Sequence, residues 1–211
     1  MKVVFLTGDN EQAIISEAAE VLRRGGSIVY PTDTVYGLGV NPFDDFAVRR
    51  LFRIKKRPAD KPVPLIIKSI AMAKKLAFID ARKEEVLRSV WPGAVSVVLY
   101  KRSIISLSVS AGTQTVALRI PDNEFCMKLI RAFNSPITST SANLSGENSM
   151  TNSIKIQEKF AKEAYKPDLL IDADTLKSRQ PSTVLDMTRG EPKITRIGPV
   201  KPKDLAKILG V

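Results

Sequence analysis

The chain has 211 residues, of which 44% are hydrophobic, and it carries a formal net charge of +11 with no histidine and one cysteine. This length fits one domain with a sizeable core, and no apolar run is long enough to cross a bilayer. The lack of histidine excludes Ser-His and Cys-His nucleophile pairs and the usual zinc sites, while the positive charge favours anionic partners such as nucleotides or RNA.

Apolar periodicity and capping residues predict regularly spaced elements in the first half of the chain. In chain order these are a strand at Val3–Leu6, a helix that Asp9 or Asn10 caps and Gly25-Gly26 ends, a strand at Ser27–Tyr30, a helix that begins at Asp44 or Asp45, a strand at Val63–Ile67 and a helix at Lys83–Val90. Pro31 ends the second strand, so the Thr-rich turn that follows lies at its carboxyl end. Pro64 indicates that the third strand lies at a sheet edge or contains a bulge.

The second half of the chain predicts more strands than helices. In chain order these are strands at Val95–Tyr100 and Thr115–Ile120, a helix at Asp122–Phe133, a strand at Ile137–Thr140, a helix at Ser153–Ala164, strands at Leu169–Asp172, Thr183–Asp186 and Lys193–Ile197, and a helix at Pro202–Leu209. Helices interleave with strands, but several strands follow one another directly. We therefore expect a single α/β domain over residues 1–211, with a twisted mixed sheet flanked by helices.

Three polar segments carry the candidate chemistry: a Thr-rich turn at 30–39, a basic run at 53–62 and a Ser/Asn turn at 139–146. Cations neutralise phosphate charge, and hydroxyls with free backbone N–H groups supply further donors, so these segments suit a cavity for a polyphosphate nucleotide. Neither a P-loop nor a dinucleotide-binding fingerprint is present. Each segment also has a local interpretation, because basic residues complement a helix C-terminus and short polar side chains satisfy turns.

Two single residues stand out from their surroundings. Arg119 lies in an otherwise apolar strand, where a guanidinium is costly unless it is paired or close to an anion. Cys126 lies in an apolar helical pattern, which indicates a buried thiol rather than a nucleophile.

The order of these motifs resembles the YrdC-like family. From about Gly25 to Gly198 the shared motifs are Tyr-Pro-Thr-Asp-Thr-Val-Tyr-Gly-Leu-Gly at 30–39, Lys-x-Arg-Pro at 55–58, Trp-Pro-Gly at 91–93, Ala-Leu-Arg-Ile-Pro at 117–121, Ser-Thr-Ser-Ala-Asn-Leu-Ser-Gly at 139–146 and Ser-Thr-Val-Leu-Asp at 182–186. The resemblance is to the short form of the family and implies a basic concave cavity. The sequence departs from the family near Ile66, where many relatives have a histidine, and at 172–175, where paired glycines are common.

The resemblance implies an activity. Members of the family form L-threonylcarbamoyladenylate and pyrophosphate from L-threonine, bicarbonate and ATP, for the threonylcarbamoyladenosine (t6A) modification of tRNA. The chain is thus expected to be a cytoplasmic nucleotidyltransferase that uses Mg2+ with ATP, has no metal site of its own, passes its product to the t6A transferase machinery and has no membrane partner.

The motifs also imply roles for individual residues. Lys55 and Arg57 are implied to be catalytic. The residues implied to bind ATP are Lys55, Arg57, Lys61, Thr115, Ser141, Asn143, Ser149 and Arg196. The residues implied to bind threonine are Thr34, Arg119, Ser139 and Ser182. Arg119 suits the carboxylate because guanidinium binds carboxylate in a bidentate way. Thr32 is implied to shape the turn.

Other interpretations stay open. A non-catalytic module could bind double-stranded RNA or tRNA in the same basic cavity, and the net charge alone supports this. A carbamoyl-transfer accessory domain of a larger synthase is a third interpretation. Tyr36 and Asp33 are both candidates for the group that takes the proton of the threonine amine.

Overall fold

The computed structural model describes residues 1–178 and 180–209. Its strands are β1 (Lys2–Phe5), β2 (Ile28–Tyr30), β3 (Gly37–Gly39), β4 (Leu65–Ile66), β5 (Val95–Tyr100), β6 (Thr115–Arg119), β7 (Ile137–Thr138), β8 (Thr140–Ser141), β9 (Leu169–Asp172), β10 (Thr183–Asp186) and β11 (Lys193–Arg196). Its helices are α1 (Glu11–Arg23), α2 (Asp45–Lys55), α3 (Ile70–Leu76), α4 (Ala81–Val90), α5 (Leu107–Ser110), α6 (Glu124–Phe133), α7 (Ser153–Ala161) and α8 (Pro202–Leu209).

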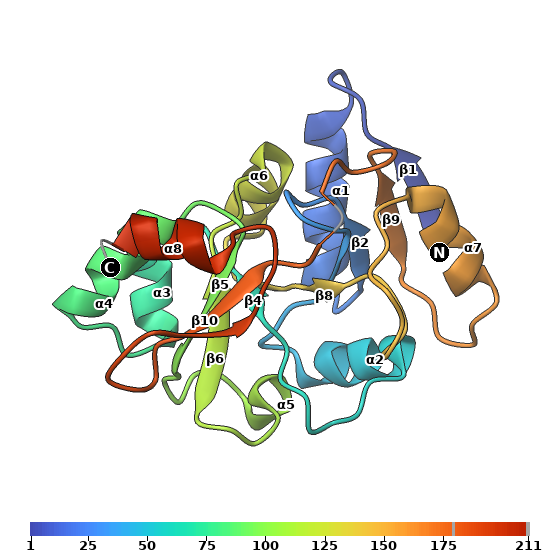
Figure 1. The fold of residues 1–211 in the computed structure, drawn as a ribbon. Helices are drawn as coiled ribbons and strands as arrows, with labels where there is room; N and C mark the ends of the chain where they lie inside the picture. Colours follow the sequence, from blue (N-terminus) through green and yellow to red (C-terminus); the bar gives the residue numbers. More distant parts are fainter. Residues whose placement is uncertain (179, 210–211) are drawn as a thin grey trace.

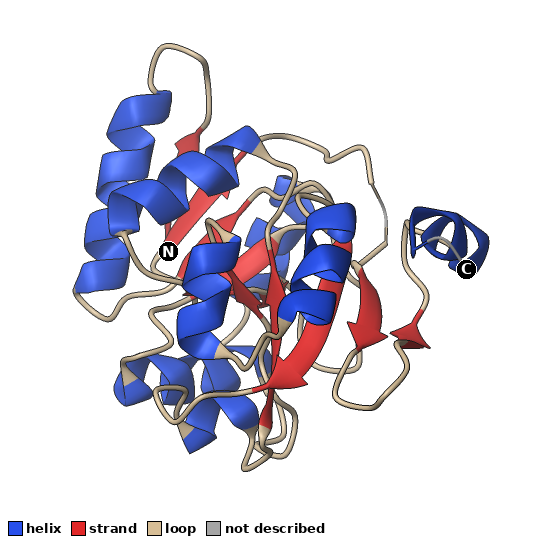
Figure 2. Ribbon diagram, turned by 90° about the vertical axis from the view of Figure 1, so that its left-hand side faces the viewer, coloured by secondary structure: helices blue, strands red, loops and turns tan. Residues whose placement is uncertain are grey.

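The strands form two mixed sheets. One has five strands in the order β1-β9-β2-β3-β8, and the other has six in the order β11-β10-β5-β6-β4-β7. In Figure 1 the five-stranded sheet lies beside α1, whereas α3, α4 and α8 lie at the far side of the six-stranded sheet. Figure 2 shows the strands running through the middle of the molecule with helices around them. The mixed α/β class is therefore confirmed, with the strands divided between two sheets where the sequence predicts one.

The division arises at Ser139, in the middle of the strand predicted at 137–140. On one side β7 pairs with β4, placing Ile137 opposite Ile66. On the other side β8 pairs with β3, placing Ser141 opposite Gly37. The backbone N–H of Ser139 donates to the carbonyl of Pro64 at 2.7 Å. The chain thus passes from the six-stranded to the five-stranded sheet at Ser139, which fixes this residue between them.

Pro64 does not mark a sheet edge. β4 pairs in parallel with β6 and antiparallel with β7, so the expectation of an edge strand there is wrong. The proline immediately precedes the two paired residues and does not have to donate a ladder hydrogen bond itself.

The strand β3 was not expected from the sequence, because two of its three residues are glycine. It pairs antiparallel with β2. A Cβ atom at Gly37 would lie 2.8 Å from the ring of Tyr30, and one at Gly39 would lie 2.7 Å from the side chain of Ile137. Glycine is needed at both positions for this close approach, and it lets the Thr-rich turn fold back beside β2.

The helices pack as their apolar periodicity predicts. α1 and α6 bury residues such as Ile15, Leu22 and Leu129 in one cluster with Ile28 of β2 and Ile171 of β9. In the described part of the chain, no helix has both the length and the apolar content that a bilayer crossing requires.

The helix α2 places the basic run beside the region where the chain passes from one sheet to the other. Asp44 caps its N-terminus by accepting hydrogen bonds from Phe46 and Ala47. Lys56 ends it in a left-handed conformation, with φ 48°. Because Val48, Leu51 and Lys55 recur at spacings of three and four residues, Lys55 lies on the buried face of the helix.

Candidate active site

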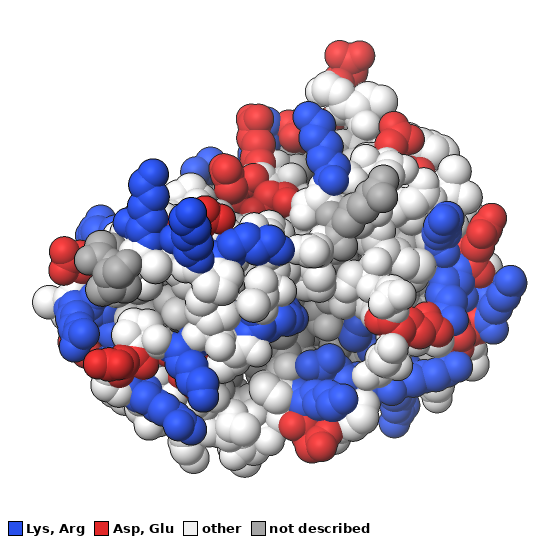
Figure 3. Space-filling view, in the orientation of Figure 1, with Lys and Arg blue, Asp and Glu red and all other residues white. Residues whose placement is uncertain are grey.

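A cavity of about 140 Å³ opens between the two sheets. Its polar lining residues are Thr32, Thr34, Tyr36, Arg57, Ser96, Arg119, Ser139, Thr140, Ser141, Ser182 and Arg196. Among the described residues, three that line the cavity are arginines and none is acidic. Basic side chains are also spread over the face of the molecule seen in Figure 3. The cavity is therefore suited to an anionic ligand.

Two threonines of the Thr-rich turn, Thr32 and Thr34, line the cavity, and the hydroxyl of Thr32 also holds the turn in shape. The hydroxyl of Thr32 donates to the carbonyl of Val35 at 2.7 Å and accepts the backbone N–H of Thr34 at 3.0 Å. These bonds confirm that Thr32 shapes the turn. The side chain of Thr34 is thereby placed beside Arg119.

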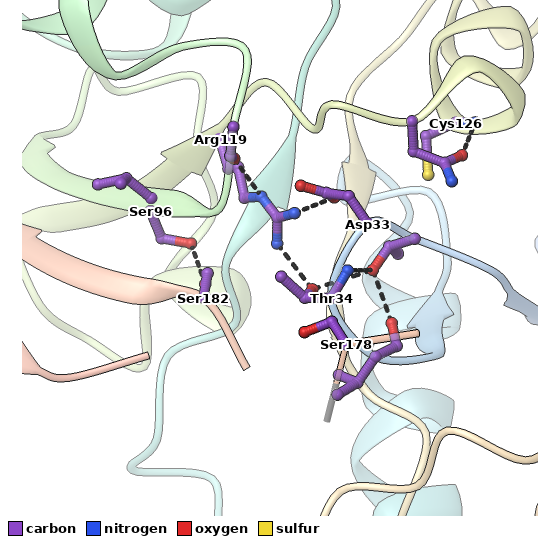
Figure 4. Close-up of polar contacts among 12 residues, drawn as sticks. Asp33, Thr34, Ser96, Arg119, Cys126, Ser178 and Ser182 are labelled. Atoms are coloured by element: carbon purple, nitrogen blue, oxygen red, sulfur yellow. Dashed lines mark hydrogen bonds and ion pairs between the residues drawn. The ribbon is translucent and has the colours of Figure 1, made fainter. Parts of the chain in front are cut away.

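Arg119 is buried and contacts three different groups, as Figure 4 shows. Its Nε donates to the carbonyl of Gly93 at 2.9 Å, and one terminal nitrogen donates to the hydroxyl of Thr34 at 3.0 Å. The other terminal nitrogen forms an ion pair with Asp33, whose side chain is also largely buried. Asp33 does not line the cavity, so the carboxylate holds the guanidinium from behind.

Ser182 lies just before β10 and is held by two neighbours. Its hydroxyl lies 2.8 Å from that of Ser96 on β5, the strand parallel to β10. Arg196, on β11, donates to the carbonyl of Ser182 at 2.9 and 2.7 Å and to its hydroxyl at 3.1 Å. Burial, together with the nearby Arg119, lowers the pKa of Arg196. Two guanidinium groups therefore lie close to each other at one end of the cavity.

Lys55 is 1% exposed and organises the Ser/Asn turn. Its ammonium donates to the carbonyls of Ser141 and Asn143, at 2.5 and 2.7 Å, and to the side-chain oxygen of Asn143 at 3.3 Å. The amide nitrogen of Asn143 donates to the carbonyls of Leu144 and Glu147. In this structure Lys55 and Asn143 therefore lie behind the cavity wall and hold Ser141 at its surface.

Arg57 faces the cavity from the loop that follows α2. Its Nε donates to the carbonyl of Lys61 at 3.2 Å, and a terminal nitrogen donates to the carbonyl of Pro62 at 2.8 Å. Burial lowers the pKa of Arg57. The side chain thus closes its own loop and presents positive charge to the cavity.

The structure brings most of the predicted site residues together. All four residues expected to bind threonine line the cavity, as do Arg57, Ser141 and Arg196. Five of the residues expected to bind ATP do not line it: Lys55 and Asn143, which lie behind the cavity wall, and Lys61, Thr115 and Ser149. Lys61 is exposed. Thr115 is the first residue of β6 and Arg119 the last, so the two lie at different ends of this strand. Ser149 lies in the loop between β8 and α7. The roles of all the site residues stay predictions.

Ser96 is not among the site residues predicted from the sequence. This buried residue lines the cavity and is flanked by apolar residues in β5. Arg119 stands out in the sequence because it is a polar residue in an otherwise apolar strand. Ser96 has the same setting and could have been identified in the same way.

Tyr36 and Cys126 are buried, and neither lies in a setting that favours its ionised form. The hydroxyl of Tyr36 donates to the carbonyl of Asp174 and accepts the N–H of Ala173, and burial raises its pKa to about 12. The thiol of Cys126 donates to the carbonyl of Pro31 at 3.1 Å, and burial raises its pKa as well. Both residues are therefore suited to packing rather than to proton transfer.

Comparisons with known proteins give consistent matches. The Sua5/YciO/YrdC family model, described as "Telomere recombination", matches residues 20–198. Over 201 residues the chain is 36% identical to a threonylcarbamoyl-AMP synthase of Pyrococcus abyssi (strain GE5 / Orsay), covering 95% of this chain and 58% of that protein. Over 198 residues it is 32% identical to a threonylcarbamoyl-AMP synthase of Bacillus subtilis (strain 168), covering 93% of this chain and 56% of that protein.

A solved structure matches over the whole chain. The crystal structure of P. abyssi Sua5 complexed with L-threonine superposes with a TM-score of 0.93 at 34% identity, covering 100% of this chain and 61% of that one. The chain therefore spans between half and two thirds of the length of these relatives.

Proposed function

The chain belongs to the Sua5/YciO/YrdC family, and from this membership we propose that it is an L-threonylcarbamoyladenylate synthase. In the proposed reaction the amine of L-threonine and bicarbonate give a carbamate with loss of water. A carbamate oxygen then attacks the α-phosphorus of ATP, and pyrophosphate leaves. The product would serve the t6A modification of tRNA in the cytoplasm, through a transferase that accepts it.

The observation that carries this proposal is the convergence of the predicted threonine residues. Thr34, Arg119, Ser139 and Ser182 come from segments far apart in the sequence, yet all four line one cavity. Arg119 suits the carboxylate of an amino acid, because a guanidinium has five N–H donors and the described contacts use three of them. The hydroxyls supply further hydrogen bonds around the amino acid.

The nucleotide would lie toward the opposite end of the cavity. Arg57 and Ser141 line that part, and the backbone beside Ser141 is held by Lys55 and Asn143. We assign the triphosphate to this end, with Lys61, Thr115 and Ser149 as the further predicted contacts. Arg196, also predicted to bind ATP, contacts Ser182 at the other end of the cavity. Mg2+ would enter with ATP, because this ion is commonly held by substrate phosphates.

The chemistry requires little from the protein in the way of proton transfer. Both the carbamate and the phosphorus centre are anionic, so they must be aligned and their charge neutralised. Arg57, Arg119 and Arg196 supply fixed positive charge in a partly enclosed cavity, where it acts more strongly than in water. This accounts for an active site built without histidine.

ATP binding is expected to be accompanied by proton uptake at Lys55. Burial, with the nearby Arg57, lowers the pKa of Lys55 to about 7, so most of this amine is neutral at about pH 8 before ATP binds. Phosphate charge beside the Ser141 turn would raise this pKa and draw a proton from solution. Titration calorimetry of ATP at about pH 8, in buffers of different ionisation enthalpy, measures the uptake.

Lysine variants identify the group that takes the proton. Lys55→Met should abolish the uptake. Lys101→Met is the matched control, because Lys101 also donates to a backbone carbonyl but lies outside the cavity lining. Uptake that persists in Lys55→Met would assign the proton to another group.

The proposed function is tested by pyrophosphate release from ATP, Mg2+ and bicarbonate, with and without L-threonine. Release that depends on both threonine and bicarbonate is the expected result. Folded protein that binds RNA but releases no pyrophosphate would overturn the synthase assignment in favour of the RNA-binding module.

A further inference from the structure

Ser182 is among the residues predicted to bind threonine, but the hydrogen bond between its hydroxyl and that of Ser96 has no part in the mechanism described so far. Both side chains are buried, and both residues line the cavity. Figure 4 shows them pointing toward each other from neighbouring segments of the six-stranded sheet. Their oxygen atoms lie 2.8 Å apart, and either atom could donate to the other. Which one donates decides what Ser182 can offer to a ligand.

The hydrogen-bond capacity of a hydroxyl limits the possibilities. A serine hydroxyl has one proton to donate and two lone pairs that accept. The hydroxyl of Ser182 already accepts from Arg196, which is always a donor. If Ser96 also donates to it, both lone pairs are occupied and the proton of Ser182 is free to point into the cavity. If Ser182 donates to Ser96 instead, it offers the ligand only a lone pair.

The charge around the pair favours the first arrangement. Arg196 contacts Ser182 directly, and Arg119 lines the same cavity. A ligand group that lies beside two guanidinium groups is expected to be anionic, and an anionic oxygen requires a donor rather than a lone pair. Within the described residues, the Ser96 hydroxyl has no hydrogen-bond partner other than Ser182.

We propose that Ser96 is a positioning residue that donates to Ser182 and thereby aims the Ser182 hydroxyl, as a donor, at the carboxylate of the amino-acid substrate. This inference rests on the proposed function and deepens it, since it divides recognition of one carboxylate between Arg119 and Ser182. It also assigns Arg196 to the threonine end of the cavity, where it holds Ser182 through both its carbonyl and its hydroxyl.

The test compares Ser96→Ala with wild-type protein. Losing one neutral hydrogen bond typically weakens binding by up to about tenfold. Ser96→Ala should therefore raise the KM for L-threonine roughly fivefold to tenfold. It should leave kcat and the KM for ATP within about twofold, because the residue does not touch the nucleotide end. Ser96→Thr, which keeps the hydroxyl and suits a strand, should restore the wild-type KM.

A second ligand separates the proposed role from general loss of structure. L-Threoninamide has an uncharged amide in place of the carboxylate. Ser96→Ala should weaken binding of L-threonine, measured by calorimetry, but change binding of L-threoninamide by less than about twofold. Equal weakening of both ligands would show a merely structural role and overturn the inference. An unchanged affinity for L-threonine would overturn it as well.

One control variant and the activity of the wild-type protein keep the outcomes distinct. Ser110→Ala removes another buried serine hydroxyl, one that donates to the carbonyl of Ser106 and does not line the cavity. It should change neither KM. If wild-type protein shows no threonine-dependent pyrophosphate release, the proposed function fails. If wild-type protein is active and Ser96→Ala behaves like it, only the present inference fails.

Discussion

Replacing Arg57 with alanine should lower threonine-dependent pyrophosphate release by about two to three orders of magnitude. In the proposed reaction this guanidinium lies beside the phosphates as charge develops on the leaving pyrophosphate. Its position is fixed in advance by hydrogen bonds to the carbonyls of Lys61 and Pro62, so it needs little rearrangement during the reaction. A steady-state assay of pyrophosphate release at saturating ATP measures the loss.

The stability of Arg57→Ala distinguishes catalysis from folding. The two hydrogen bonds that are lost lie within one loop, so the free energy of unfolding should fall by only about 1 kcal/mol. Arg102→Ala is a matched control. Its guanidinium also donates to a backbone carbonyl, that of Lys74, but lies over Phe78 and outside the cavity lining. Equal loss of activity in both variants, or a collapse in melting temperature of Arg57→Ala, would argue against a catalytic role.

Replacing Arg119 with lysine should raise the KM for L-threonine by about 100-fold, with little change in the KM for ATP. The guanidinium uses three different nitrogen atoms to contact Gly93, Thr34 and Asp33. A lysine ammonium has a single nitrogen, so it can keep the ion pair with Asp33 only by giving up other contacts. It then lacks the planar fork that binds a carboxylate, and threonine titrations of the pyrophosphate assay will measure the effect.

The choice of lysine rather than alanine follows from Asp33. Removing all positive charge at position 119 would leave a largely buried carboxylate unpaired, at a cost of about 3–5 kcal/mol. Arg50→Lys offers the matched control, because Arg50 binds Asp168 in a bidentate way at 2.5 and 2.6 Å but does not line the cavity. An Arg119→Lys protein with wild-type threonine affinity would remove Arg119 from the binding site.

Local signals in the sequence predict much of the fold. Asp44, one of the two residues predicted to begin α2, accepts hydrogen bonds from the first turn of that helix. The helical spacing that buries Val48 and Leu51 also buries Lys55, so the inward direction of that lysine could have been predicted too. The sequence shows that the basic run carries several cations. Which of them faces inward depends on its position around the helix, relative to the buried apolar residues.

Contacts between distant segments account for what the sequence could not predict. The break at Ser139 depends on which strands flank β7 and β8, and pairing partners are not encoded by the local pattern. The bond between Ser96 and Ser182 likewise depends on the parallel pairing of β5 with β10. Short helices such as α3 and α5 offer too few residues for a clear apolar period.

Hydrogen bonds between distant segments lie around the cavity, so they determine when the site can be completed during synthesis of the chain. Thr34 meets Arg119 across 85 residues, and both Lys55 with Ser141 and Ser96 with Ser182 meet across 86. A nascent chain that has left the ribosome only as far as β8 lacks Asn143, Ser149, Ser182 and Arg196, and it also lacks β9, which pairs with β1 and β2 in the five-stranded sheet. In the proposed reaction both substrates would be retained only after nearly the whole described chain has been synthesised, and a chain truncated after β8 should not hold threonine and ATP together.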